Sequence, residues 1–137
     1  MDSVSLWINR ASRALTRLQD NRIRPLGFGM SQMPVLHALQ GGAALTQKEL
    51  ASHAGVEQPS MAQLLGRMER DGVVERVPNP DDGRGSLISL ERAARARLPE
   101  AKELLIDTER DALAGFSAKE KELLLGFLQR VVHNVEG

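Results

Sequence analysis

Two short stretches of the chain carry polar residues at a spacing that suits contact with nucleic acid. The first, residues 57–71, has helical periodicity, with an apolar face made by Met61, Leu64, Leu65 and Met68. The opposite face presents Gln58, Pro59, Ser60, Ala62, Gln63, Gly66 and Arg67. Glutamine pairs with adenine, serine bonds a phosphate or a base, and small residues permit close approach. An ordinary solvated helix face has a similar composition, so this helix alone leaves both interpretations open.

The second stretch is Asp82-Gly83-Arg84, within a segment dense in turn-forming residues. An arginine at the tip of a hairpin can enter a minor groove, where the electrostatic potential is most negative. We expect Asp82 to hold the guanidinium of Arg84 in a fixed pose through charge-assisted hydrogen bonds. The alternative is a solvated turn with a casual ion pair.

The elements around these stretches match a winged helix-turn-helix. Thr46 and Glu49 form a capping box that begins a short helix, and Gly55 ends it before the helix at 57–71. Gly72 closes that second helix. Residues 73–77 and 87–90 then read as two strands, joined by a polar loop at 78–86. Two helices, a turn and a hairpin in this order predict a mainly α fold with a small β-hairpin wing.

Long helices flank this unit on both sides. Residues 4–23 form one, and a second helix is expected to begin at Ser31 as its N-cap and to run to the Gly41-Gly42 stop. Residues 94–112 are helical, with Pro99 marking a kink or the true start. Ser117 and Glu120 form a second capping box that begins a last helix, whose apolar stripe runs from Leu123 to Val135. Left exposed, this stripe would be a large hydrophobic patch on a small monomer, so we expect an obligate homodimer.

Composition excludes several classes of function. The chain has 137 residues, no cysteine, three histidines and zero net charge, which excludes disulfides, thiolate metal sites and thiol redox sensing. The three histidines are scattered, so we expect no metal site. The sequence contains no nucleophile–base set and no phosphate loop, so we expect neither an enzyme nor a cofactor. No signal peptide or membrane span is visible, so we expect a cytoplasmic protein.

Charge along the chain is uneven. Acidic residues outnumber basic ones from Glu49 to Glu91. The affinity of this segment for DNA therefore depends on placed groups such as Arg67, Arg76 and Arg84 more than on a broad positive field.

Residues 45–90 resemble the MarR family of bacterial transcription regulators. The similarity lies in Leu-Thr-Gln-Lys-Glu-Leu-Ala at 45–51, in 60–68, in Asp-Gly-Val-Val-Glu-Arg at 71–76, in Asn-Pro-Asp-Asp-Gly-Arg at 79–84 and in 87–90. The flanking helices also fit, although Glu91 and Ala94 stand where the family usually has Thr and Gly. The resemblance implies one MarR-like domain over residues 1–137, with a DNA-binding lobe at 31–92. Residues 1–25 and 93–137 would form a helical dimerisation region.

The function implied by the resemblance is sequence-specific transcriptional regulation. The protein would be a repressor that a small-molecule ligand releases from a palindromic operator in double-stranded DNA; the alternative is a winged-helix protein-interaction module without DNA binding. The implied DNA-binding residues are Gln58, Ser60, Gln63, Arg67, Asp82 and Arg84. Many relatives bind small aromatic acids, and Arg10, Arg17, Met33 and His37 are the candidates to line such a pocket. Alternatively, Trp7 packs in the dimer core and these arginines are solvated.

Overall fold

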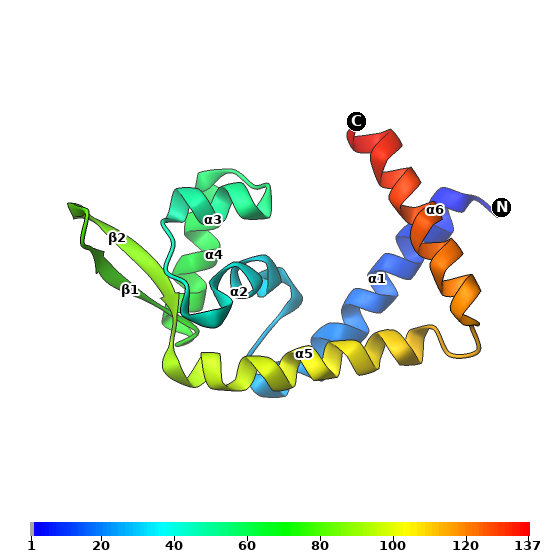
Figure 1. The fold of residues 1–137 in the computed structure, drawn as a ribbon, viewed down its shortest axis with the longest axis horizontal. Coiled ribbons are helices and arrows are strands. Elements are labelled where there is room, and N and C mark those ends of the chain that lie inside the picture. Colours follow the sequence, from blue (N-terminus) through cyan, green and yellow to red (C-terminus); the bar gives the residue numbers. More distant parts are fainter. Residues whose placement is uncertain (1) are drawn as a thin grey trace.

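The computed structural model describes residues 2–137, which form a helical molecule with one two-stranded sheet (Figure 1). The α-helices are α1 (Val4–Ile23), α2 (Met33–Leu39), α3 (Gln47–Ala54), α4 (Gln58–Arg70), α5 (Arg92–Ala112) and α6 (Ala118–Glu136). Three 3-10 turns, η1 (Arg24–Leu26), η2 (Met30–Gln32) and η3 (Gln40–Gly42), flank α2, and the strands are β1 (Val74–Asn79) and β2 (Asp82–Leu90). Helices α2–α4 and the hairpin gather over one end of α5, while α1 and α6 lie toward its other end.

Local signals in the sequence set several helix ends. The Thr46 hydroxyl accepts the Glu49 N–H at 3.1 Å while the Glu49 carboxylate accepts the Thr46 N–H at 3.1 Å, so the predicted capping box is confirmed. Ser117 and Glu120 repeat it at α6. The backbone N–H bond from Thr46, followed by the bond from its hydroxyl, lowers the pKa of Glu49 because both favour the charged carboxylate. Gly55, with φ of 67°, ends α3 in the left-handed conformation that glycine adopts without strain.

The hydrophobic core lies inside the lobe that α2–α4, the strands and the first half of α5 form together. Its fully covered side chains include Leu36 and Leu39 from α2, Leu50 from α3 and Ile88 from β2. From α4, three residues of the predicted core face, Met61, Leu65 and Met68, are fully buried, and Leu64 is partly buried. The helical periodicity of residues 57–71 therefore identified the inner face of α4.

The hairpin is longer than its sequence suggests. Strands β1 and β2 pair antiparallel from Val74↔Leu90 to Pro78↔Ser86, and the register shifts between Pro78 and Asn79. The expected loop at 78–86 was therefore too long, because most of its turn formers lie within the strands. Pro78 is tolerated because both strands of a two-stranded sheet are edge strands, in which an N–H that faces away from the partner makes no ladder hydrogen bond.

Two expected helix starts were wrong. Ser31 lies within η2 and caps nothing, because Gln32 precedes α2 and Pro34 occupies its first turn. A start of α5 at Pro99 is also wrong, since the helix begins at Arg92 and continues through the proline. Pro99 is exposed, so water can satisfy the backbone carbonyl that loses its helical partner.

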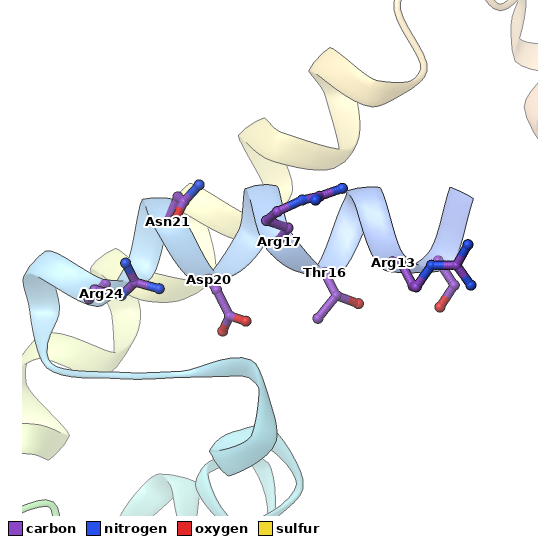
Figure 2. Close-up of a pocket in the computed structure, with 7 residues that line it drawn as sticks. Arg13, Thr16, Arg17, Asp20, Asn21 and Arg24 are labelled. Atoms are coloured by element: carbon purple, nitrogen blue, oxygen red, sulfur yellow. The ribbon is translucent and has the colours of Figure 1, made fainter. Parts of the chain in front are cut away.

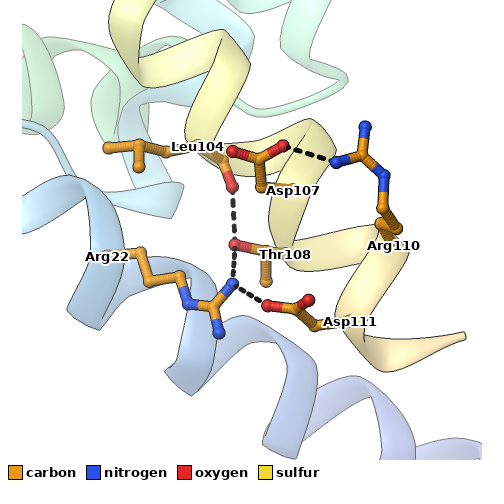
Figure 3. A network of polar contacts seen from close by, with 6 residues as sticks. All are labelled: Arg22, Leu104, Asp107, Thr108, Arg110 and Asp111. Carbon is orange, nitrogen blue, oxygen red and sulfur yellow. Dashed lines mark hydrogen bonds and ion pairs between the residues drawn. The ribbon is translucent and has the colours of Figure 1, made fainter. Parts of the chain in front are cut away.

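A polar network fastens α1 to α5 (Figure 3). The Arg22 guanidinium donates to the Asp111 carboxylate at 2.7 Å and to the Thr108 hydroxyl at 3.2 Å. The hydroxyl in turn donates to the Leu104 carbonyl at 2.6 Å. Thr108 is completely buried, so its contact with Arg22 fixes the packing of α1 against α5.

Helix α6 has no buried residue. Its apolar side chains face outward, with Leu125 58%, Phe127 54% and Val135 80% exposed, and Trp7 on α1 is 52% exposed. Within residues 2–137, no helix is long and apolar enough to cross a membrane. The terminal helices therefore present an extended apolar surface that the lobe does not cover.

Candidate nucleic-acid interface

One side of helix α4 is buried in the core, and the opposite side is exposed to solvent. Gln58, Ser60, Gln63 and Arg67 are all exposed, as predicted for its outer face. A Cβ added at Gly66 would meet no atom within 4 Å. This glycine is therefore not required by packing inside the lobe, and its lack of a side chain leaves space on the outer face.

The N-terminus of α4 is open. Glu57 precedes the helix, but its side chain makes no capping hydrogen bond, and Pro59 lies in the first turn. The first N–H groups of a helix lack intrahelical acceptors, and the helix dipole makes this end attractive to anions. Pro59 has no N–H, so within the described chain the start of α4 offers the backbone donors of Gln58 and Ser60 beside their polar side chains, an arrangement suited to a phosphate.

The wing tip is shaped by short polar side chains. Asp82 Oδ1 accepts the backbone N–H of Arg84 at 3.0 Å, and Asn79 Oδ1 accepts that of Asp81 at 3.0 Å. A Cβ on Gly85 would lie 3.0 Å from Asp82 Oδ2, so this position favours glycine. Arg84 itself is exposed.

The expected ion pair between Asp82 and the Arg84 guanidinium is absent from the described residues. The carboxylate instead binds the backbone N–H of Arg84, which lies nearer than the far end of the side chain. Asp82 therefore sets the turn geometry, and the Arg84 side chain extends free from the tip.

One ion pair at this interface could not be anticipated from the sequence. Arg76 Nε donates to Glu69 Oε2 at 2.8 Å and thereby joins β1 to α4. Both side chains are partly exposed, and no helical spacing relates them, because a turn separates the two elements. Arg76 was expected to contribute charge toward DNA, but part of that charge is already neutralised by Glu69.

The four candidate ligand residues do not share one recess. A hollow along α1 and η1 includes Arg17 (Figure 2) but is not lined by Arg10, Met33 or His37. Arg10 lies over the Trp7 ring, 5.2 Å from its centroid. Met33 packs against the lobe core, and exposed His37 is 3.3 Å from the Gln40 amide. No group of three His, Asp or Glu side chains in residues 2–137 is placed to hold a metal ion.

Comparison with known proteins agrees with this geometry. The model of the MarR family matches residues 26–85. The HTH-type transcriptional regulator YwoH of Bacillus subtilis, itself uncharacterised, is 30% identical over 115 residues, which cover 84% of this chain and 83% of YwoH.

Solved structures give the same result. A mutant of Escherichia coli MarR complexed with operator DNA superposes with a TM-score of 0.81 at 27% identity, covering 94% of this chain and 93% of that one. A probable transcriptional regulator from Pseudomonas aeruginosa gives a TM-score of 0.80 at 29% identity, covering 95% and 97%. This chain belongs to the MarR family of transcriptional regulators.

Proposed function

We propose that this protein is a repressor that binds a palindromic DNA operator as a homodimer and leaves it when a small molecule binds. MarR-family proteins are DNA-binding regulators and not enzymes. The observation that carries the proposal is the outer face of α4, whose polar side chains are exposed beside an open helix N-terminus while its inner face fills the core. A similar E. coli protein, the MarR mutant, has been solved in complex with operator DNA, which supports DNA binding by this chain.

In this proposal some of the exposed residues read bases and the others position the protein on the DNA. Gln58 and Gln63 read base edges in the major groove, with adenine as the base that glutamine pairs with best. Ser60 and Arg67 bind phosphates and position the helix. Arg84 enters the minor groove from the wing tip, and Asp82 supports it by shaping the turn.

The dimer is proposed from the uncovered apolar surface. Side chains such as Leu125, Phe127 and Val135 are more than half exposed on α6, and the cost of keeping such a continuous surface in water favours association. The helical segments at 1–25 and 93–137 would make the dimer, leaving the lobe at 31–92 for DNA.

Light scattering at micromolar concentration tests the dimer, and a stable folded monomer would refute it. Replacing Leu128 and Val131 together with aspartate should unfold or aggregate the chain and not yield a soluble monomer. The paired change Lys119→Gln with Lys121→Gln, at exposed polar positions of the same helix, lowers the net charge by the same two units and is the control for charge.

The ligand is proposed from the resemblance to relatives that bind small aromatic acids. Arg17, the one candidate that lines the recess on α1, would supply its counter-charge, whereas Arg10, Met33 and His37 lie outside that recess. A ligand that prefers one spacing of the two lobes needs a differential affinity of only a few kcal/mol to release DNA.

Fluorescence anisotropy with DNA from upstream of the protein's own gene tests the DNA-binding proposal. We expect tighter binding than to a shuffled duplex of equal length at the same salt concentration. Equal affinity for both duplexes would instead favour a winged-helix module that binds protein, an alternative supported by the acidic excess between Glu49 and Glu91.

A further inference from the structure

A recess runs along the second half of α1 and reaches Arg24 at the start of η1. It has a volume of about 340 Å³, and every residue that lines it is polar. In Figure 2 the lining includes Arg13, Thr16, Arg17, Asp20, Asn21 and Arg24. An aromatic ring has no apolar side chain to pack against here, whereas a hydrophilic ligand finds several hydrogen-bonding groups.

The recess carries a surplus of positive charge. Arg13, Arg17 and Arg24 have no ion-pair partner among residues 2–137. The carboxylate of Asp20 is the single acidic group in the lining, and its Oδ1 accepts the Met30 N–H at 2.6 Å. Three guanidinium groups against one carboxylate leave a net positive site, even after allowance for the partial negative charge at the C-terminal end of α1.

The spacing of these arginines suits a ligand with more than one anionic group. At about 1.5 Å of rise per residue, Arg13 and Arg17 are about 6 Å apart along the helix, and Arg17 and Arg24 about 10 Å. Guanidinium groups bind carboxylates and phosphates through paired N–H donors. The second oxygen of Asp20 and the Thr16 hydroxyl could accept hydrogen bonds from a hydroxyl of the same ligand.

We propose that this recess binds a small hydrophilic anion with two or more negative charges, such as a hydroxylated polycarboxylate. Arg13, Arg17 and Arg24 hold its charged groups, and Thr16, Asp20 and Asn21 orient it. This ligand class departs from the aromatic acids that the resemblance implies. The proposal deepens the ligand-release part of the proposed function, and it rests on that function for any effect on DNA.

Isothermal titration of the full-length protein with citrate, acetate and salicylate at constant ionic strength tests the site. Citrate should bind at least tenfold more tightly than acetate and more tightly than salicylate. The double variant Arg13→Gln with Arg17→Gln should lose at least tenfold in citrate affinity, while Arg92→Gln, an exposed arginine of α5 outside the recess, should bind citrate as the wild type does.

Three results would overturn the proposal: citrate binding no tighter than acetate, salicylate binding tighter than citrate, or equal losses in the double variant and in Arg92→Gln. DNA binding is measured separately without ligand. Figure 1 places α1 apart from α4 and the wing, so the double variant should bind DNA normally once light scattering has shown that it assembles as the wild type does. Citrate binding by a wild-type protein that fails to bind DNA would support the site and refute only the repressor function.

Discussion

Replacing Arg84 with alanine should weaken operator binding and leave the fold intact. Arg84 is exposed at the wing tip, and its side chain has no ion-pair partner among the described residues. The hydrogen bond at this position joins its backbone N–H to Asp82, and alanine retains that N–H. The substitution removes no core packing, so the free energy of unfolding should change by no more than about 0.5 kcal/mol.

The expected loss in DNA affinity is much larger. A contact between arginine and a groove or phosphate is worth about 1–3 kcal/mol, which corresponds to roughly 5- to 150-fold in the dissociation constant for one wing. A symmetric dimer carries two wings, so the measured loss should lie toward or above the upper end of that range.

Fluorescence anisotropy with operator DNA at matched salt concentration measures this loss. Arg110→Ala is the matched control, because Arg110 is also exposed and lies on α5. Its surface ion pair with Asp107 contributes little to the stability of the fold. The reasoning fails if the Arg84 variant binds with wild-type affinity, or if Arg110→Ala weakens binding as much.

Three further predictions concern specificity, stability and pH. Gln63→Ala should change the ranking of single-base operator variants, because base contacts specify while phosphate contacts position; a uniform loss across all variants in a binding array would contradict it. Thr108→Val should destabilise the fold by about 1–2 kcal/mol in urea unfolding by removing the buried hydroxyl between Arg22 and α5, whereas Thr108→Ser should retain most of the stability. Glu49→Gln should lower the melting temperature at pH 7, and the difference from the wild type should disappear as the pH falls below about 4. The hydrogen bonds from Thr46 lower the folded-state pKa of Glu49, so they stabilise the fold only while the carboxylate is charged. A difference in melting temperature that persists at pH 2.5 would refute this.

The sequence predicted those parts of the fold that local chemistry determines. The capping boxes at Thr46 and Ser117 and the left-handed glycine at Gly55 each involve residues a few positions apart, so their partners are visible in the sequence. The inner face of α4 followed from helical periodicity. Of the two alternatives at Pro99, a start of α5 there was wrong, because the cost of a proline inside a helix depends on whether water reaches the freed carbonyl, which is a property of the folded surface.

The parts that the sequence could not predict depend on contacts between distant segments. The bond between Arg22 and Thr108 and the ion pair between Arg76 and Glu69 require that helices and strands be placed in space first. The recess on α1 also depends on the folded arrangement. The sequence marked Arg17 as a ligand candidate, but it did not mark Arg13 and Arg24, which line the same recess. Of the candidate interface, the exposed side of α4 was predictable, whereas the role of Asp82 in the turn became visible only in the structure.

Selection of binding sites from a randomised DNA pool tests the central claim most directly. The purified full-length protein is mixed with duplexes that carry a random 30-bp segment, and the retained sequences are amplified and read. A dimer that reads DNA with α4 of each subunit should enrich an imperfect palindrome whose half-sites are centred about 10 bp apart, so that both helices meet one face of the duplex. Enrichment of a single asymmetric half-site, or of no sequence at all, would contradict the account.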